Sequence, residues 1–222
     1  MIELHHVAKR YRSDRGLEHW ALRDVSFTLP VKGTLGVIGR NGAGKSTLLR
    51  LIAGADHPSS GTLRRLGRVS WPLGLTGGLQ GSLTGRQNSR FVCRIHGMAE
   101  SEMAEQLAFI QSFSDLGEAF DWPVKTYSSG MNARLKFALA LVFDFDVYLT
   151  DELTAVGDAA FQAKSLAAFK SRLSGAGLIM VAHSEKTLRD YCESGLLLHQ
   201  GKGYYFNNIQ EAFKMYREVS GA

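Results

Sequence analysis

The amino-acid sequence contains no stretch that is long and apolar enough to cross a membrane. A transmembrane helix requires roughly 18 or more uncharged apolar residues. The longest candidate in the 222 residues, FALALVFDFDVYL, is interrupted by Asp144 and Asp146, so we expect it to lie in a protein core. The first residues, MIELHHVAKR, also lack the apolar region of a signal peptide. We therefore expect the protein to stay in the cytoplasm.

Cysteine is scarce, and basic residues do not gather in blocks. Cys93 and Cys192 are far apart and show no metal-ligand spacing near histidine, which predicts two buried, reduced thiols. The formal net charge of +5 permits contact with nucleic acid or anionic lipid, but there is no dense run of Lys and Arg. A mildly basic, solvated surface is the simpler interpretation. Internal repeats and low-complexity linkers are also missing, and the length allows one large α/β domain or a core with a small inserted subdomain.

The sequence does contain an alternation of apolar strands and amphipathic helices. Hydrophobic residues make up 45% and charged residues 21%, which is typical of a globular protein. Residues 2–36 predict mainly short strands, and a later helix, STLLRLIAG, is expected to stop at Gly54. The alternation resumes with the strands FDVYLTDEL, GLIMVAHS and GLLLHQGKGYYF and with helices near 158–174, 184–193 and 208–219.

A glycine-rich segment and two helices lie between these halves. PLGLTGGLQGSLTG has five glycines in fourteen residues, which indicates a joint or a ligand-approach loop; a flexible surface connection is the alternative. Thr84 then predicts a helix N-cap that forms a capping box with Gln87. Residues 83–130 thus predict a helical insert. Its apolar stripes, which we expect to be packing surfaces, are Phe91, Val92 and Ile95 on the first helix and Met103, Leu107, Ile110 and Phe113 on the second.

The segment GRNGAGKS, residues 39–46, is a predicted P-loop. It matches the phosphate-binding pattern G-x-x-x-x-G-K-[ST] and lies between a predicted strand and a predicted helix. Its glycines let backbone N–H groups wrap around phosphates, because a Cβ atom would obstruct that approach. Lys45 is placed to reach the β- and γ-phosphates, and the Ser46 hydroxyl is placed to coordinate Mg²⁺. The predicted contacts of ATP here are Gly39, Arg40, Asn41, Gly42, Ala43, Gly44, Lys45, Ser46 and Thr47.

Two further strands end in residues that suit phosphate chemistry. The apolar strand in DVYLTDE ends in two acids, Asp151 and Glu152. Asp151 would lie beside the P-loop and hold the magnesium shell. Glu152 could orient and polarise an attacking water. A solvated turn is the alternative for these two acids. GLIMVAHS places His183 after another buried strand. Such a histidine alone is ordinarily a core residue, but the P-loop layout leaves a γ-phosphate contact unfilled there, which favours a catalytic role.

The stretch YSSGM, residues 127–131, runs directly into a predicted helix. Small residues at a helix start leave backbone N–H groups open, which makes an anion site. Ser128, Ser129 and Gly130 therefore predict a second phosphate-binding helix start. A plain helix cap is the alternative.

The order of these motifs resembles the nucleotide-binding subunit of ABC transporters over essentially the whole chain. The motifs are the P-loop, the glycine-rich loop, the helical insert, YSSGM, DVYLTDE, TAVGD and AHS. YSSGM stands where that family carries its Leu-Ser-Gly-Gly-Gln signature. In the family, two subunits pair head to tail, and each signature contacts the γ-phosphate held by the opposite P-loop. The resemblance implies that Ser128, Ser129 and Gly130 serve a partner's nucleotide in a symmetric dimer.

Other positions follow from the same resemblance. Tyr11 in VAKRY falls where the family stacks an aromatic ring on adenine, with Trp20 as the competing residue. Asp158 in TAVGD matches the loop that touches the opposite subunit. Gln80 is available for the role of the loop glutamine that senses the γ-phosphate, and we assign it to the metal site although its spacing does not fix the match.

Departures from the family pattern indicate its polysaccharide-export branch. Met131 and Ser129 replace the last residue and the first glycine of the signature, and LTAVGD lacks the usual proline after Glu152. YSSGM with ELTAVGD looks like the branch that moves capsule, O-antigen or teichoic-acid chains. SWPLGLTGGLQGSLTGRQNSRFVCRIHG looks like its capsular-polysaccharide subunit. Only thirty-nine residues follow His183, too few for the carbohydrate-binding domain of many O-antigen exporters, so we expect the short capsule-type form.

The resemblance also implies a fold and a set of partners. We expect a single α/β domain of the P-loop NTPase (ABC ATPase) type over 1–222. An N-terminal antiparallel β subdomain and a RecA-like core would occupy 1–82 and 131–222, and a helical subdomain, 83–130, would carry the signature at its end. ATP and Mg²⁺ would close a dimer of two copies. A multi-span membrane permease with the polysaccharide export machinery would hold the chain at the cytoplasmic face of the inner (cytoplasmic) membrane.

Two other functions compete with polysaccharide transport. A soluble ATPase of the same superfamily acting on nucleic acid or ribosomes usually has two cassettes per chain or long coiled coils, and the sequence shows neither, so no nucleic-acid partner is expected. A small-molecule kinase would use the P-loop but would leave YSSGM and His183 without a role. Within the branch, export of O-antigen or teichoic acid is the alternative to export of capsule.

Overall fold

The chain folds into two compact units. The sheet unit comprises Met1–Pro72, Phe145–Glu152 and Leu173–Ala222, and the helical unit comprises Leu73–Asp144 and Leu153–Arg172. The residues that the computed structural model describes are 1–12, 16–73, 79–151, 158–182 and 184–221.

Within the described residues, nine strands form the sheet in the order β4-β1-β2-β9-β8-β3-β7-β6-β5. At one end β1 pairs antiparallel with β2 and β4, whereas β3 lies parallel between β7 and β8. The parallel part continues with β6 beside β7, and β8 pairs antiparallel with β9. The predicted α/β fold with antiparallel N-terminal strands is confirmed. The strands are β1 Ile2–Arg12, β2 Glu18–Leu29, β3 Thr34–Ile38, β4 Ser60–Arg65, β5 Val69–Leu73, β6 Val147–Asp151, β7 Gly177–Val181, β8 Ser194–His199 and β9 Lys202–Phe206.

The central parallel strands are apolar along nearly their whole length. The sequences TLGVI, VYLTD and GLIMV of β3, β6 and β7 are buried at all but their end positions, as expected for parallel strands covered on both faces. The first helix, α1 (Lys45–Ala53), buries Leu48, Leu49, Leu51 and Ile52 in the same core cluster as these strands. The P-loop therefore joins two elements that share one apolar core.

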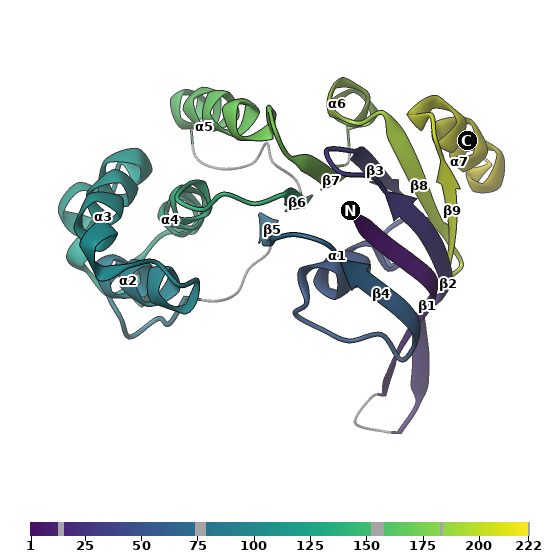
Figure 1. Ribbon diagram of the computed structural model, residues 1–222, viewed down its shortest axis with the longest axis horizontal. Coiled ribbons are helices and arrows are strands. Elements are labelled where there is room, and N and C mark those ends of the chain that lie inside the picture. Colours follow the sequence, from purple (N-terminus) through teal and green to yellow (C-terminus); the bar gives the residue numbers. More distant parts are fainter. Residues whose placement is uncertain (13–15, 74–78, 152–157, 183, 222) are drawn as a thin grey trace. The chain divides into compact units, whose positions relative to one another are not determined.

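Among the described residues of the sheet unit, three helices form. α1 ends at Gly54, which adopts the left-handed conformation (φ 78°), so the predicted stop is confirmed. α6 (Glu185–Tyr191) packs against β3, and α7 (Ile209–Ser220) packs against β8, β9 and β3. Figure 1 shows α6 near the end of β8 and α7 beside β9, in the yellow, C-terminal part of the chain.

The helical unit is built around α2 (Gly85–Ile95), α3 (Glu100–Ser114), α4 (Ser129–Leu141) and α5 (Ala159–Leu173). Two short 3-10 turns, Gly117–Asp121 and Val124–Thr126, lead into α4. Three aromatic rings join the helices: the centroid of Phe113 on α3 lies 6.2 Å from Phe137 on α4 and 5.9 Å from Phe161 on α5. These contacts hold the start of α5 to α3 and α4.

The structure corrects the predicted packing face of α2. Phe91 and Ile95 are 55% and 62% exposed, and the helix instead buries a small and polar face that includes Asn88 and Cys93. Asn88 can be buried because its amide donates to the carbonyl oxygens of Gln80, Leu83 and Thr84. A polar residue with all its hydrogen bonds satisfied therefore took the place that the apolar pattern assigned to Phe91, Val92 and Ile95.

The other helix predictions in this unit are confirmed. Thr84 caps α2: its hydroxyl accepts from the Gln87 backbone N–H at 3.1 Å, and the Gln87 side chain accepts from the Thr84 N–H at 2.9 Å. On α3 the predicted stripe is buried at Met103, Leu107 and Ile110, which pack inside the unit.

The expectation of two buried, reduced thiols is confirmed. Cys93 and Cys192 are buried free thiols, and burial raises their pKa values to about 11 and about 12. Both are therefore protonated near neutral pH. Among the residues that the structure describes, no helix combines the length and the apolar character needed to span a bilayer.

Candidate active site

The P-loop connects β3 to α1 and has the backbone of a phosphate cradle. Gly42 and Gly44 adopt left-handed conformations, with φ values of 81° and 100°. A Cβ atom on Gly44 would lie 2.6 Å from the carbonyl oxygen of Ala21, and one on Gly39 would lie 2.6 Å from that of Leu198. Only glycine fits at positions 39 and 44 without moving neighbouring backbone.

The Lys45 side chain folds back over the loop that it follows. Its Nζ donates to the carbonyl oxygens of Gly39 at 2.6 Å and of Arg40 at 3.0 Å. The ammonium group thus lies over the loop at the start of α1, and the first turn of α1 contains no acidic residue. The ammonium group and the helix start both favour an anion here.

Asp151 and Ser46 approach each other from β6 and α1. The Ser46 hydroxyl donates to Oδ2 of Asp151 at 3.4 Å. A hydroxyl and a carboxylate are hard oxygen ligands of the kind that Mg²⁺ prefers. Among the described residues no group of three or more His, Cys, Asp and Glu side chains could hold a metal by itself. Mg²⁺ fits this pair only as an ion that shares its coordination with water and nucleotide phosphates.

Two predicted catalytic residues, Glu152 and His183, lie outside the described residues. The strands that precede them are neighbours in the sheet, because β6 pairs parallel with β7 and Asp151 lies opposite Val181. Their catalytic roles stay predictions.

The two aromatic candidates for the adenine ring lie in different surroundings. The hydroxyl of Tyr11 on β1 donates to Oδ2 of Asp56 at 2.8 Å. Trp20 on β2 instead lines a cavity of about 770 Å³ together with residues 40–43 of the P-loop, the β8–β9 turn, Tyr204 and Tyr216. Tyr11 is not among the residues that line this cavity. Stacking of adenine on Tyr11 stays a prediction.

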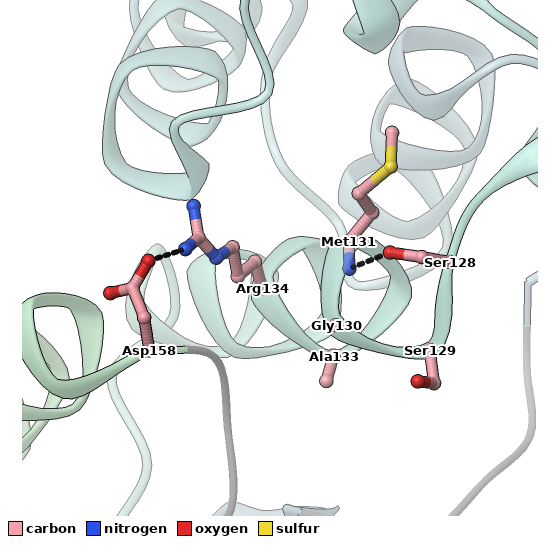
Figure 2. A pocket seen from close by; sticks show the side chains of 7 residues that line it. All are labelled: Ser128, Ser129, Gly130, Met131, Ala133, Arg134 and Asp158. Atoms are coloured by element: carbon pink, nitrogen blue, oxygen red, sulfur yellow. Dashed lines mark hydrogen bonds and ion pairs between the residues drawn. The ribbon is translucent and has the colours of Figure 1, made fainter.

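The signature residues lie at the start of α4, as predicted. Ser128 is the N-cap, and its hydroxyl accepts from the Met131 N–H at 3.2 Å. The residues around this helix start line a hollow of about 710 Å³, which Figure 2 shows with the Ser129 side chain pointing away from the helix axis. Ser128 and Ser129 are exposed, and the first turn contains no acidic residue. The helix start can therefore accept an anion from outside the helical unit.

Gln80 is held through its backbone rather than its side chain. Its N–H donates to Oδ1 of Asn88 at 2.7 Å, and its carbonyl accepts from the Asn88 amide at 3.0 Å. Gln80 belongs to the helical unit, whereas Ser46 and Asp151 belong to the sheet unit. Its place in the metal site stays a prediction.

Sequence reasoning missed several residues that support the site. Asp56 and Lys9 hold Tyr11, and Arg134 on α4 pairs with Asp158 at 2.6 Å. Arg65 donates to the carbonyls of Leu51 and Ile52 at the end of α1. Apart from Lys9 in VAKRY and Asp158 in TAVGD, these residues belong to no motif, and the partners of all of them become visible only in the folded chain.

The fold and the P-loop together define a class: an α/β nucleotide-binding protein of the P-loop type. A family model described as ABC transporter matches residues 22–155. The polysialic acid transport ATP-binding protein KpsT of Escherichia coli is 45% identical over 98% of this chain and 99% of its own length. The capsule polysaccharide export ATP-binding protein CtrD of Neisseria meningitidis serogroup B is 42% identical over 99% of this chain and 100% of its own length.

The solved structures include a similar fold. A dimeric ATP-binding cassette in a post-hydrolysis state, bound to ADP and Pi, superposes with a TM-score of 0.77 at 21% identity and covers 91% of this chain and 96% of its own. The chain belongs to the ABC transporter family. It binds nucleotide and is an ATPase.

Proposed function

We propose that this chain is the ATP-hydrolysing subunit of an ABC transporter that exports capsular polysaccharide across the cytoplasmic membrane. The observation that carries the substrate class is the full-length similarity to two proteins named for polysialic acid transport and capsule polysaccharide export. The P-loop, the Ser46–Asp151 pair and the exposed start of α4 support the ATPase part of the proposal.

The first step is the binding of ATP phosphates to the P-loop. Backbone N–H groups of residues 39–47 would donate to the phosphate oxygens, and the adenine ring would stack on Tyr11. Lys45 would exchange its two carbonyl acceptors, Gly39 and Arg40, for β- and γ-phosphate oxygens. The Lys45 ammonium group is charged in both states, but the phosphate oxygens add a Coulomb attraction that neutral carbonyl oxygens lack, so the exchange favours the nucleotide.

Hydrolysis then needs positioning and charge stabilisation more than covalent chemistry. Mg²⁺, held by Ser46 and Asp151 with Gln80 as a further ligand, would supply positive charge against the developing phosphate charge. Glu152 would orient and polarise the attacking water, and His183 would contact the γ-phosphate.

The partner subunit would complete the phosphate cage. Ser128, Ser129 and Gly130 present a helix start that is exposed in the isolated chain. In a head-to-tail dimer each of these starts would meet the γ-phosphate held by the other P-loop, which gives two equivalent sites. ATP can drive closure because these contacts exist only in the closed state.

The proposal places the chain at the cytoplasmic face of the membrane, attached through a multi-span permease that forms the glycan conduit. Its α4 would serve the dimer, and other parts of the helical unit would transmit closure to the permease. Fractionation with and without the permease tests this placement. The chain should sediment with membranes only when the permease is present, and nucleic-acid binding with a steep salt dependence would contradict it.

A mixing experiment tests the shared site. Lys45→Ala disables a P-loop, and Ser128→Ala alters an α4 start, so each homodimer should be inactive. A 1:1 mixture forms heterodimers with one intact P-loop facing one intact α4, and we expect about a quarter of wild-type ATPase activity if pairing is random and the sites are independent. Full activity of Ser128→Ala alone would contradict the shared site.

A variant at the proposed water-orienting residue supplies the second test. Glu152→Gln should bind ATP but stall hydrolysis, so an ATP-stabilised dimer should accumulate in gel filtration.

Deleting the protein in cells should leave the capsular glycan inside the cytoplasm while its synthesis continues. Intact capsule export in its absence would contradict the substrate.

A further inference from the structure

Arg134 on α4 makes two contacts with the region where α5 begins. Its Nη2 lies 2.6 Å from Oδ2 of Asp158, and its guanidinium group lies 4.8 Å from the ring centroid of Phe161. The Arg134 side chain is only 21% exposed. Figure 2 shows its guanidinium group reaching along α4 to Asp158.

Asp158 is fixed from a second side as well. Its Oδ1 accepts from the Phe161 N–H at 2.9 Å, and its backbone carbonyl accepts from the Gln162 N–H at 2.9 Å. The Phe161 N–H, followed by the charge of Arg134, holds the pKa of Asp158 below its usual value. One carboxylate oxygen therefore caps α5 while the other binds α4.

The same hollow contains both the signature residues and this ion pair. Its lining includes Ser128, Ser129, Gly130, Arg134 and Asp158. Arg134 lies about one helical turn beyond Gly130 on α4, so its position relative to the signature is set by helix geometry. Asp158 is 64% exposed, and ion pairs this accessible contribute little to stability. The ion pair acts together with the contact of Arg134 with the Phe161 ring and with the helix-cap bond of Asp158, and these three contacts fix the distance between Asp158 and the start of α4.

We propose that Arg134 is a positioning residue that locks Asp158 to α4, so that the signature residues and Asp158 meet the partner subunit's nucleotide site as one rigid edge. The proposal rests on the shared site described above. It adds that the start of α5 moves with the signature and that loss of Arg134 misplaces Asp158 without altering the P-loop of the same chain.

The test uses two heterodimers that contain the same substitutions in different arrangements. In the first, Arg134→Met is in the chain that also carries Lys45→Ala, so the altered α4 faces the intact P-loop of the partner. In the second, Arg134→Met is in the chain with the intact P-loop, so it faces the disabled one. Two affinity tags purify each heterodimer. Both arrangements contain one Arg134→Met chain, so a loss of stability would lower both activities equally.

We expect ATPase activity to be about tenfold lower in the first heterodimer than in the second, because a misplaced group costs activity only where it faces a working site. Asp158→Asn keeps a good helix cap but loses the charge, and it should give the same asymmetry. Arg90→Met, which removes an exposed arginine of α2, is the matched control and should give equal activities.

Ser128→Ala in the same two arrangements separates this proposal from the shared site. An asymmetry for Ser128→Ala but equal activities for Arg134→Met would overturn the role of Arg134 alone. Equal activities for Ser128→Ala would overturn the shared site itself, and the role of Arg134 with it.

A second measurement tests the role of Arg134 if coupling between the two sites abolishes the ATPase activity of both heterodimers. The ATP-dependent association of the Arg134→Met chain should then show a Kd about tenfold higher than that of Arg90→Met. The affinity of the monomer for a fluorescent ATP analogue should be unchanged. Equal association constants would overturn the proposal.

Discussion

Replacing Asp56 should destabilise the sheet unit, because its carboxylate joins the segment after α1 to β1. Oδ1 accepts from Lys9 Nζ at 2.6 Å and from the His57 N–H at 2.7 Å, and Oδ2 accepts from the Tyr11 hydroxyl at 2.8 Å. The Lys9 and Asp56 side chains are only 13% and 17% exposed. Substitution of Asp56 therefore leaves a nearly buried ammonium group with one remaining acceptor, the carbonyl of His57.

The magnitude follows from the pKa of Asp56 and from its contacts. Burial raises this pKa, but hydrogen bonds from Lys9, Tyr11 and His57 outweigh burial and lower it from 3.8 to about 2. At 1.36 kcal/mol for each pKa unit, the carboxylate stabilises the fold by at most about 2.5 kcal/mol. We expect Asp56→Asn to cost about 1 to 2 kcal/mol. Asp56→Ala should cost about 2 to 3 kcal/mol, because it also removes the acceptor for Tyr11.

Urea denaturation followed by tryptophan fluorescence measures these values. A Trp122→Phe background removes the one tryptophan of the helical unit, so that Trp20 and Trp71 report on the sheet unit. Tyr11→Phe is the matched control, since it keeps the ring and loses one donor, and it should cost about 1 kcal/mol. A change below about 0.5 kcal/mol for Asp56→Asn would refute the reasoning.

The pH dependence has a defined sign. The folded-state pKa of Asp56 lies below the unfolded value, so the stabilisation is complete above about pH 4 and is lost as the pH falls through about 2. The difference in free energy of unfolding between wild type and Asp56→Asn should therefore shrink on going from pH 7 to about pH 3. A difference that is constant or that grows toward acid would show that the carboxylate charge is not the cause.

Three further substitutions have defined outcomes. Gly44→Ala forces a Cβ to within 2.6 Å of the Ala21 carbonyl at a left-handed φ of 100° and should weaken binding of a fluorescent ATP analogue by at least about tenfold. Gly42→Ala meets the strain of a left-handed φ of 81° but no protein atom within 4 Å of its Cβ, so it should weaken binding less than Gly44→Ala does. Thr84→Ala breaks the capping box of α2 and should lower the free energy of unfolding by about 1 kcal/mol in urea, and Thr84→Ser should restore most of it. Tyr127→Phe removes the hydroxyl that donates to the Ala119 carbonyl at 2.6 Å and should also cost about 1 kcal/mol; an unchanged urea midpoint would show that this bond adds nothing.

The sequence predicts those parts of the fold that are determined by residues close together in the chain. The P-loop, the Thr84 capping box and the stop at Gly54 each depend on a few consecutive residues, and the structure confirms the capping box and the stop. The buried parallel strands are predictable for a similar reason, since continuous apolar runs bounded by turns leave few other placements. Short motifs and apolar runs therefore predict the helices, the strands and the loop that carries the predicted phosphate contacts.

The predictions fail where the deciding contacts follow no local sequence pattern. The apolar stripe of α2 pointed to Phe91 and Ile95, but Asn88 was buried instead because the backbone around residues 80–84 accepts its amide protons. Lys9 and Asp56 are 47 positions apart, and Arg134 and Asp158 are 24 apart. No local pattern links such pairs, so the residues that hold Tyr11 and the start of α5 were not predictable before the fold was known.

The P-loop and the start of α4 differ in the groups that they offer to a phosphate. In the P-loop, the Lys45 ammonium group lies over the loop and donates to the carbonyls of Gly39 and Arg40. At the start of α4, the Ser128 hydroxyl accepts from the Met131 N–H, and Ser128 and Ser129 are exposed. The P-loop therefore offers a phosphate an ammonium charge within its own chain, whereas the exposed helix start can reach a phosphate that another chain holds. Interactions formed only in a closed dimer can lower the barrier to hydrolysis rather than merely tighten binding. In the proposed head-to-tail dimer, dividing the contacts between two chains would therefore make ATP hydrolysis depend on closure.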